Sequence, residues 1–96
     1  MDTILEEIGK STKPVIRIIR KAKHFKVFAI GLNKGVTLKD HKAPGRTKLL
    51  ILHGAVNYVT AEKSLTLRQF DEYEIPLEEV HQVTGLEEAV CLLVVG

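Results

Sequence analysis

The chain has 96 residues, 45% of them hydrophobic and 27% charged, with a formal net charge of +2; this balance is typical of one globular domain and argues against disorder. No apolar run approaches the roughly 20 residues that cross a bilayer, and Glu6 and Glu7 fall where the apolar core of a signal peptide would begin, so we expect no membrane span and no export. The one cysteine, Cys91, excludes an internal disulfide framework and favours a reducing, cytoplasmic location.

The first 14 residues are expected to form a short N-terminal helix and its connection to the rest of the chain. Ile4, Leu5 and Ile8 lie about one helical turn apart, with Asp2 as a cap and Gly9 as a stop. The pattern then changes to short β-rich segments with turn signals between them. The expected strands cover residues 15–19, 26–32, 36–41, 49–52, 55–60, 64–67, 71–75, 80–84 and 89–95. This spacing predicts an all-β sandwich or barrel over residues 15–96, in a single domain spanning 1–96.

The charge is distributed unevenly along the chain. Residues 1–48 carry 12 Lys and Arg against 4 Asp and Glu, a net of +8, whereas residues 49–96 carry 2 against 8, a net of −6. The basic stretch 10–26 could bind phosphates, be the solvated side of a strand, or complement the acidic half of the chain. Only Phe25 and Phe28 lie near it, so no base-stacking platform is evident and nucleic acid is an unlikely partner.

Two segments of the sequence share their spacing with a known pair of motifs. In the first, five residues separate Gly35 from His41, and Gly54 closes the segment; in the second, four residues separate Pro76 from His81. Together these positions resemble the two motifs of the cupin family, and the resemblance extends over about residues 26–95. It implies a double-sheet jelly-roll barrel with one interior pocket. It also implies a homodimer, which would suit a chain this short because a small domain buries a limited share of its surface.

The second motif departs from the family pattern at three positions. Phe70 and Glu78 stand where the family has glycines, and Gly85 stands where it has asparagine. These departures affect the loop that precedes His81. We expect Glu78 and Glu79 to form a solvated turn there.

The ligand set of metal-binding cupins is only half present. The resemblance places His41 and His81 at the first and last of three histidine positions, but Ala43 occupies the second and Thr47 the glutamate position (Lys48 if the spacing shifts by one). A stable Zn, Fe or Mn site takes three or more protein ligands. We therefore expect no tightly bound ion, with weak binding of Zn, Fe, Mn or Ni by the two histidines as the alternative. Without metal, both could bind a ligand, move a proton or be structural.

The resemblance predicts a small-molecule-binding barrel whose reaction, if any, the sequence does not identify. The ligand could be anionic, because Lys39 shares strand parity with His41, although a bulge would turn it outward. The alternatives are a metal-dependent isomerase or oxygenase, and a non-catalytic regulatory or nucleic-acid-binding module that uses the basic half. The expected pocket residues are His41, Ala43, Thr47, Leu49, Ile51, Tyr73, His81 and Val83.

Three further residues are interpreted as structural or superficial. His24 lies in the basic stretch and His53 lies beside the turn glycine, so both are expected at the surface. Cys91 sits between Val90 and Leu92 in an apolar strand, so we expect a packed core thiol and not a nucleophile.

Overall fold

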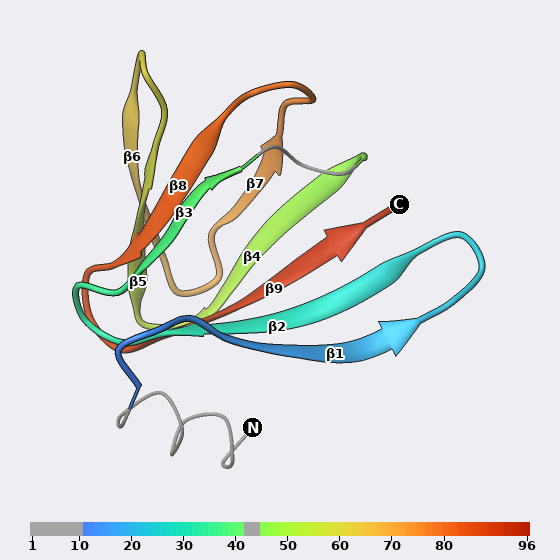
Figure 1. Ribbon diagram of the computed structural model, residues 1–96, viewed down its shortest axis with the longest axis horizontal. Helices are drawn as coiled ribbons and strands as arrows, with labels where there is room; N and C mark the ends of the chain where they lie inside the picture. The colour runs from blue at the N-terminus through green and yellow to red at the C-terminus, as the bar shows by residue number, and fades with distance from the viewer. Residues whose placement is uncertain (1–10, 42–44) are drawn as a thin grey trace.

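The computed structural model describes residues 11–41 and 45–96, without the side chains of residues 40 and 41 (Figure 1). The expected N-terminal helix lies outside this range. The described part of the chain contains strands and no helix, and therefore no helix that could cross a membrane. The all-β prediction is confirmed. The strands are β1 Val15–Lys21, β2 Lys26–Leu32, β3 Thr37–His41, β4 Thr47–His53, β5 Ala55–Val59, β6 Ser64–Arg68, β7 Glu72–Ile75, β8 His81–Gly85 and β9 Ala89–Val95.

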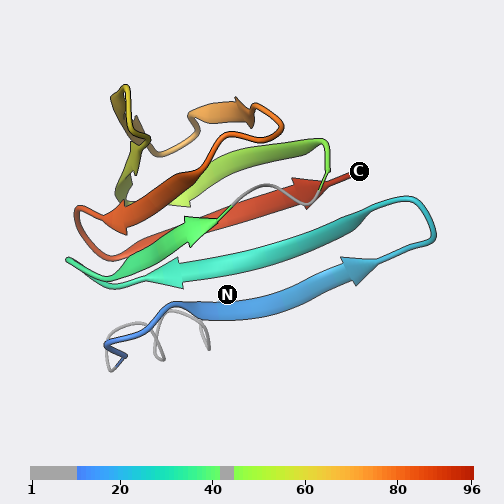
Figure 2. The same ribbon diagram turned by 45° about the horizontal axis from the view of Figure 1, so that its top comes forward.

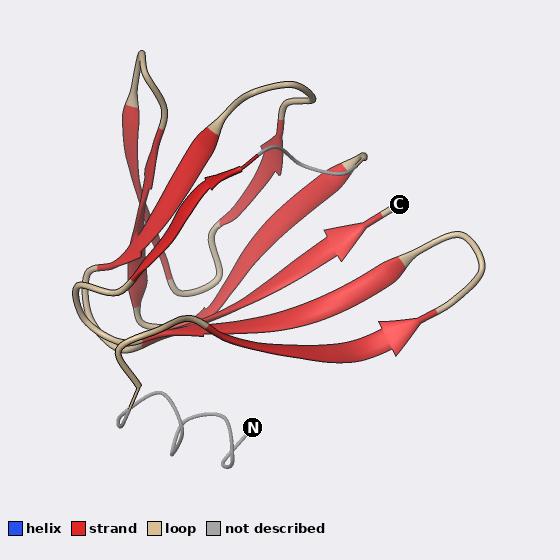
Figure 3. Ribbon diagram, viewed as in Figure 1, coloured by secondary structure: helices blue, strands red, loops and turns tan. Residues whose placement is uncertain are grey.

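The strands form two antiparallel sheets that face each other (Figures 1 and 2). The five-stranded sheet has the order β1-β2-β9-β4-β7, and the four-stranded sheet has the order β3-β8-β5-β6. From β2 onward the chain passes between the sheets at almost every connection, and the loops gather at the ends of the strands (Figure 3). This double-sheet arrangement is the jelly roll that the spacing of the motifs implied.

The core lies between the two sheets and is built by alternation along each strand. On β4, Thr47, Leu49 and Ile51 are buried, whereas the residues between them are more exposed. Successive side chains of a strand point to opposite faces, so these three point inward. β8 repeats the pattern with His81 and Val83. The main apolar cluster joins both sheets through Ile30, Leu32, Leu49, Ile51, Val56, Tyr58, Leu67, Ile75, Val83, Ala89 and Cys91.

β1 is an edge strand, and most of it is exposed. Val15 is buried in a small second cluster with Ala29 and Val90, but every later residue of the strand is exposed. Its pairing with β2 is interrupted by a register shift between Ile18 and Arg20. Bulges and charged side chains are common devices on edge strands, because they discourage uncontrolled pairing with other strands.

Two turns hold non-glycine residues in the left-handed region. Phe70, between β6 and β7, has φ 71°, and Glu78, between β7 and β8, has φ 67°. These are the two positions at which the second motif departs from glycine. Left-handed backbone costs an ordinary L-residue roughly 1–2 kcal/mol. Both turns therefore adopt a backbone conformation that favours glycine, although they hold Phe70 and Glu78.

Candidate functional site

His81 begins β8 and lies inside the barrel, with only 1% of its surface exposed. Its Nδ1 lies 3.0 Å from the backbone oxygen of Glu79. A carbonyl oxygen can only accept, so this contact assigns a hydrogen to Nδ1. In the neutral ring, Nε2 then carries the lone pair. The ring stacks on Tyr58 with centroids 5.0 Å apart and planes inclined by 20°, which holds its orientation.

His41 lies opposite His81 on the neighbouring strand. β3 and β8 are antiparallel, and His41 and His81 are partners in their register. Directly opposed residues in such a pair have Cα atoms about 4.5–5.5 Å apart. The fold therefore brings together the backbone of the two histidines, which are 40 residues apart in the sequence.

Leu49, His81 and Val83 share the wall of a small interior cavity. The other residues that line it are apolar, and its volume is about 10 Å³, which is close to the minimum for one water molecule. Of the other expected pocket residues, Thr47 and Ile51 are buried and Tyr73 is half-buried, but they do not line this cavity. Ala43 lies outside the described residues.

Tyr58 and Glu79 form a contact beside His81 that sequence reasoning missed. The Tyr58 hydroxyl donates to Glu79 Oε1 at 2.8 Å. Burial raises the pKa of Tyr58, and the hydrogen bond to Glu79 raises it further, so this phenol stays protonated. The expected solvated turn is wrong for Glu79, which is half-buried, and holds for the exposed Glu78. Tyr58 had a readable signal, since a phenol at an inward strand position needs a partner.

Lys63 and Tyr73 extend this contact to the surface. Lys63 Nζ donates to the Tyr73 hydroxyl at 2.7 Å and lies 3.8 Å from Glu79 Oε2. The hydrogen bond to Tyr73 raises the pKa of Lys63, so its ammonium is retained. The Tyr73 ring lies against Tyr58, with centroids 4.8 Å apart. Glu79 therefore contacts Lys63 with its carboxylate and His81 with its backbone carbonyl.

The described residues do not fit a tightly held metal ion. Thr47, at the glutamate position, is buried, and its hydroxyl donates to the Gly45 oxygen at 2.8 Å. Within residues 11–39 and 45–96, no three His, Cys, Asp or Glu side chains are grouped so that they could hold an ion. A transition-metal site normally needs at least three such ligands.

Cys91 also lines the small cavity, but as a buried thiol. It is almost completely buried, and burial raises the pKa of its thiol to about 12. A nucleophilic cysteine needs the opposite shift, so the core interpretation is supported. Lys39 is exposed, and the inward position next to it is taken by Leu38, which lines the cavity. His24 and His53 are exposed, as expected.

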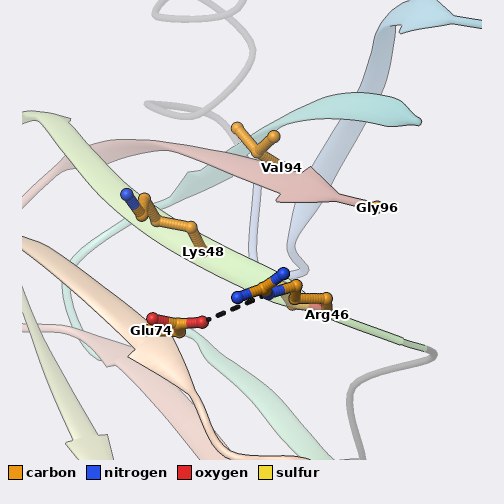
Figure 4. A pocket seen from close by; sticks show the side chains of 6 residues that line it. Arg46, Lys48, Glu74, Val94 and Gly96 are labelled. Atoms are coloured by element: carbon orange, nitrogen blue, oxygen red, sulfur yellow. Dashed lines mark ion pairs between the residues drawn. The ribbon is translucent and has the colours of Figure 1, made fainter. Parts of the chain in front are cut away.

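A larger hollow lies at the surface, away from the His81 ring. It has a volume of about 380 Å³ and is lined by Arg46, Lys48, Glu74 and the chain end (Figure 4). Arg46 Nε lies 3.6 Å from Glu74 Oε1, with side chains 82% and 63% exposed. Such exposed pairs contribute about 0–1 kcal/mol. Of the described residues that line this hollow, Thr47 has the one buried polar side chain, and its hydroxyl already donates to the Gly45 oxygen, so the hollow offers less chemistry than the surroundings of His81.

Comparison with known proteins shows the fold. No protein-family model matches the chain, and no curated protein matches it. Among solved structures, a cupin superfamily protein from Desulfitobacterium hafniense has a TM-score of 0.79 at 16% sequence identity, and the match covers 85% of this chain and 75% of that protein. A cupin-like protein from Thermotoga maritima has a TM-score of 0.77 at 20% sequence identity, and the match covers 85% of this chain and 67% of that protein. A conserved protein of unknown function from Streptococcus pyogenes has a TM-score of 0.76 at 21% sequence identity, and the match covers 85% of this chain and 72% of that protein.

Proposed function

We propose that this chain, which has the cupin fold, binds a small polar molecule through His81, with His41 as a second group on the neighbouring strand. One observation carries the proposal. His81 is an imidazole enclosed in an apolar core, and the Glu79 carbonyl directs its Nδ1 hydrogen. A purely apolar side chain would fill this position at no polar cost, so an imidazole enclosed here supports a polar role for the ring.

The chemistry available at Nε2 is acceptance of a hydrogen bond or of a proton. When the ring is protonated, the Glu79 carbonyl still accepts from Nδ1, and the stacked Tyr58 ring keeps the orientation. These are the supports that a general base requires. Binding needs only the hydrogen bond, and a catalysed reaction would add proton transfer at the same atom. Because Ala43 and Thr47 stand at two of the four ligand positions of metal-binding cupins, we do not propose a metal-dependent isomerase or oxygenase.

The interior must open to admit a ligand larger than water. The cavity of about 10 Å³ is lined by nine residues, and all but Leu38 and Leu93 are buried. Leu38 and Leu93 are the half-buried members of the lining, so we propose that they move when a ligand enters. Shortening Leu38 to alanine should enlarge the entrance without removing a polar contact.

The ligand class includes anions, although Lys39 no longer supports this. Lys63 supplies the cation instead, because its ammonium lies 3.8 Å from the carboxylate of Glu79, the residue whose backbone carbonyl contacts His81. A carboxylate or phosphate could compete with Glu79 for Lys63. Small carboxylic acids, phosphates and neutral polyols are therefore the compounds to test.

The test is a titration of these compounds followed by the ¹H–¹⁵N spectrum of the histidine rings. The critical variant is His81→Asn, because the asparagine amide can still donate to the Glu79 oxygen while Nε2 is lost. His53→Asn is the matched control at an exposed position. We expect binding by the wild type, tighter binding by Leu38→Ala, and at least a tenfold loss in His81→Asn alone.

Two results would contradict the proposal. One is equal affinity of the wild type and His81→Asn for every compound that binds. The other is a His81 ring in the wild type whose Nδ1 carries no hydrogen, because Nε2 would then carry the hydrogen and could not accept one from a ligand.

We further propose a homodimer and a cytoplasmic location. The homodimer is supported by exposed apolar side chains on both halves of the chain. The location is supported by the lone cysteine, a buried free thiol. Sedimentation equilibrium and cell fractionation test these two statements.

A further inference from the structure

The exposed apolar side chains divide into two groups that differ in the charge around them. Four are in the basic half, on β1 or in the turn that follows it, and four are in the acidic half, in loops. In the described residues the first group is Ile16, Ile18, Ile19 and Phe25, and the second is Phe70, Leu77, Val80 and Leu86. The exposed apolar side chains of the basic half are thus close together on one hairpin, whereas those of the acidic half are spread over three loops, and only Leu77 and Val80 share the β7–β8 loop.

The first surface is the hairpin of β1 and β2. Residues 15–32 contain five Lys and Arg and no Asp or Glu. Its turn is closed by the Ala22 amide donating to the Phe25 oxygen at 2.9 Å, and it projects past the ends of β4 and β9 (Figures 1 and 2). At this tip Phe25 is 42% exposed, between the exposed lysines Lys23 and Lys26.

The second surface is a hollow between the β5–β6 turn and the β7–β8 loop. It has a volume of about 360 Å³, ample for one aromatic side chain. Its lining consists of apolar residues, Thr60 and three glutamates, and the Lys63 ammonium beside it lies 3.8 Å from Glu79 Oε2. The residues that matter here are Ala61, Leu77, Val80, Glu62, Glu78 and Glu79.

We propose that the hairpin tip of one copy docks in this hollow of a second copy. Phe25 would enter among Leu77 and Val80, and Lys23 and Lys26 would face Glu62 and Glu78 of the partner. Contact between two hairpins is disfavoured, because it would bring together five cations from each copy and no acid. We propose a two-fold axis between the copies, which would make the contact twice and close the assembly as a dimer; the same contact without that axis would give a ring or an open chain of copies.

A charge-swap experiment on the full chain tests this docking. One variant combines Lys23→Glu with Lys26→Glu, and the other combines Glu62→Lys with Glu78→Lys. By sedimentation equilibrium at low salt we expect a dimer for the wild type and at least a tenfold weaker association for each variant alone. An equimolar mixture of the two should dimerise again, because both contacts then have opposite charges. The wild-type dimer should weaken as salt is added.

Matched controls separate docking from general charge effects. Lys34→Glu and Glu87→Lys change exposed charges outside both surfaces and should leave association unchanged. Phe25→Ser keeps every charge and should weaken the dimer. A monomeric wild type, a dimer that persists in either charge variant, or a mixture that fails to reassociate would each overturn the proposal. A monomeric wild type that binds anionic vesicles or polyanions through the hairpin would also overturn it, in favour of another occupant.

Discussion

Raising the pH through the alkaline range should destabilise the protein through Cys91. The thiol is buried in the core, and burial raises its pKa from 9.0 to about 12. Below pH 9 the thiol is protonated in both states. Above pH 9 the unfolded chain loses this proton and the folded chain keeps it, so the unfolded state binds fewer protons. The free energy of unfolding must therefore fall as the pH rises through this range.

The magnitude follows from the two pKa values. One titrating group changes the free energy of unfolding by about 1.4 kcal/mol per pH unit. Cys91 should thus remove about 2 kcal/mol by pH 10.5, and about 4 kcal/mol if the folded state survived to pH 12. A domain of this size is typically stable by about 5–14 kcal/mol, so the effect is a large share of the total.

The assay compares the wild type with Cys91→Ala by urea unfolding, followed by circular dichroism with reductant present, from pH 7.5 to 10.5. Alanine cannot titrate, and the small cavity that it leaves costs a similar free energy at every pH. Lysines and tyrosines titrate in both proteins and cancel in the difference. Stability curves that remain parallel between pH 8.5 and 10.5 would refute the buried-thiol reasoning.

The remaining predictions concern single contacts. Tyr58→Phe should cost about 1–3 kcal/mol by urea unfolding, because it removes a hydrogen bond to a carboxylate, and in combination with Glu79→Gln the losses should be less than additive. Glu78→Gly should raise the thermal midpoint, with a gain of up to about 1 kcal/mol, because φ is 67° there; an unchanged or lower midpoint would count against strain at this turn. Gly54→Ala should cost more than about 2 kcal/mol, since φ is 74° and a Cβ would overlap a backbone oxygen. Protein purified without nickel should hold substoichiometric transition metal by elemental mass spectrometry, with no change in His81→Asn; stoichiometric metal in the wild type would show that the donor set is larger than the described residues.

Alternation along the strands predicted much of the fold, but not the order in which the strands pair. The inward positions of Leu49 and Ile51 follow from a period of two, which is a local property of β4. The neighbours of β9 are β2 and β4, and no local pattern encodes which distant strand pairs with which. A double-sheet barrel was therefore readable, whereas its sheet order required the three-dimensional structure.

The site was predictable where it depends on strands and missed where it depends on loops. His81 has the buried inward position that its strand implies. Glu79 was wrongly expected in solvent. Its carboxylate accepts from Tyr58 because of the shape of its loop, in which Glu78 has a left-handed backbone, and hydrophobic periodicity does not reveal such a loop conformation. Lys39 was placed by parity with His41, but the register of β3 shifts between Leu38 and His41, so parity fails there.

The central place of the last strand also constrains the order of folding. β9 follows the other eight described strands in the sequence, yet it lies between β2 and β4 and pairs with both. Until β9 has been synthesised, β2 and β4 cannot be joined in one sheet, and each has an open edge. Pairings between strands so distant in sequence close slowly, because the loop entropy is lost before the contacts form. The chain should therefore be most prone to aggregation until β9 has been synthesised and has paired with both strands.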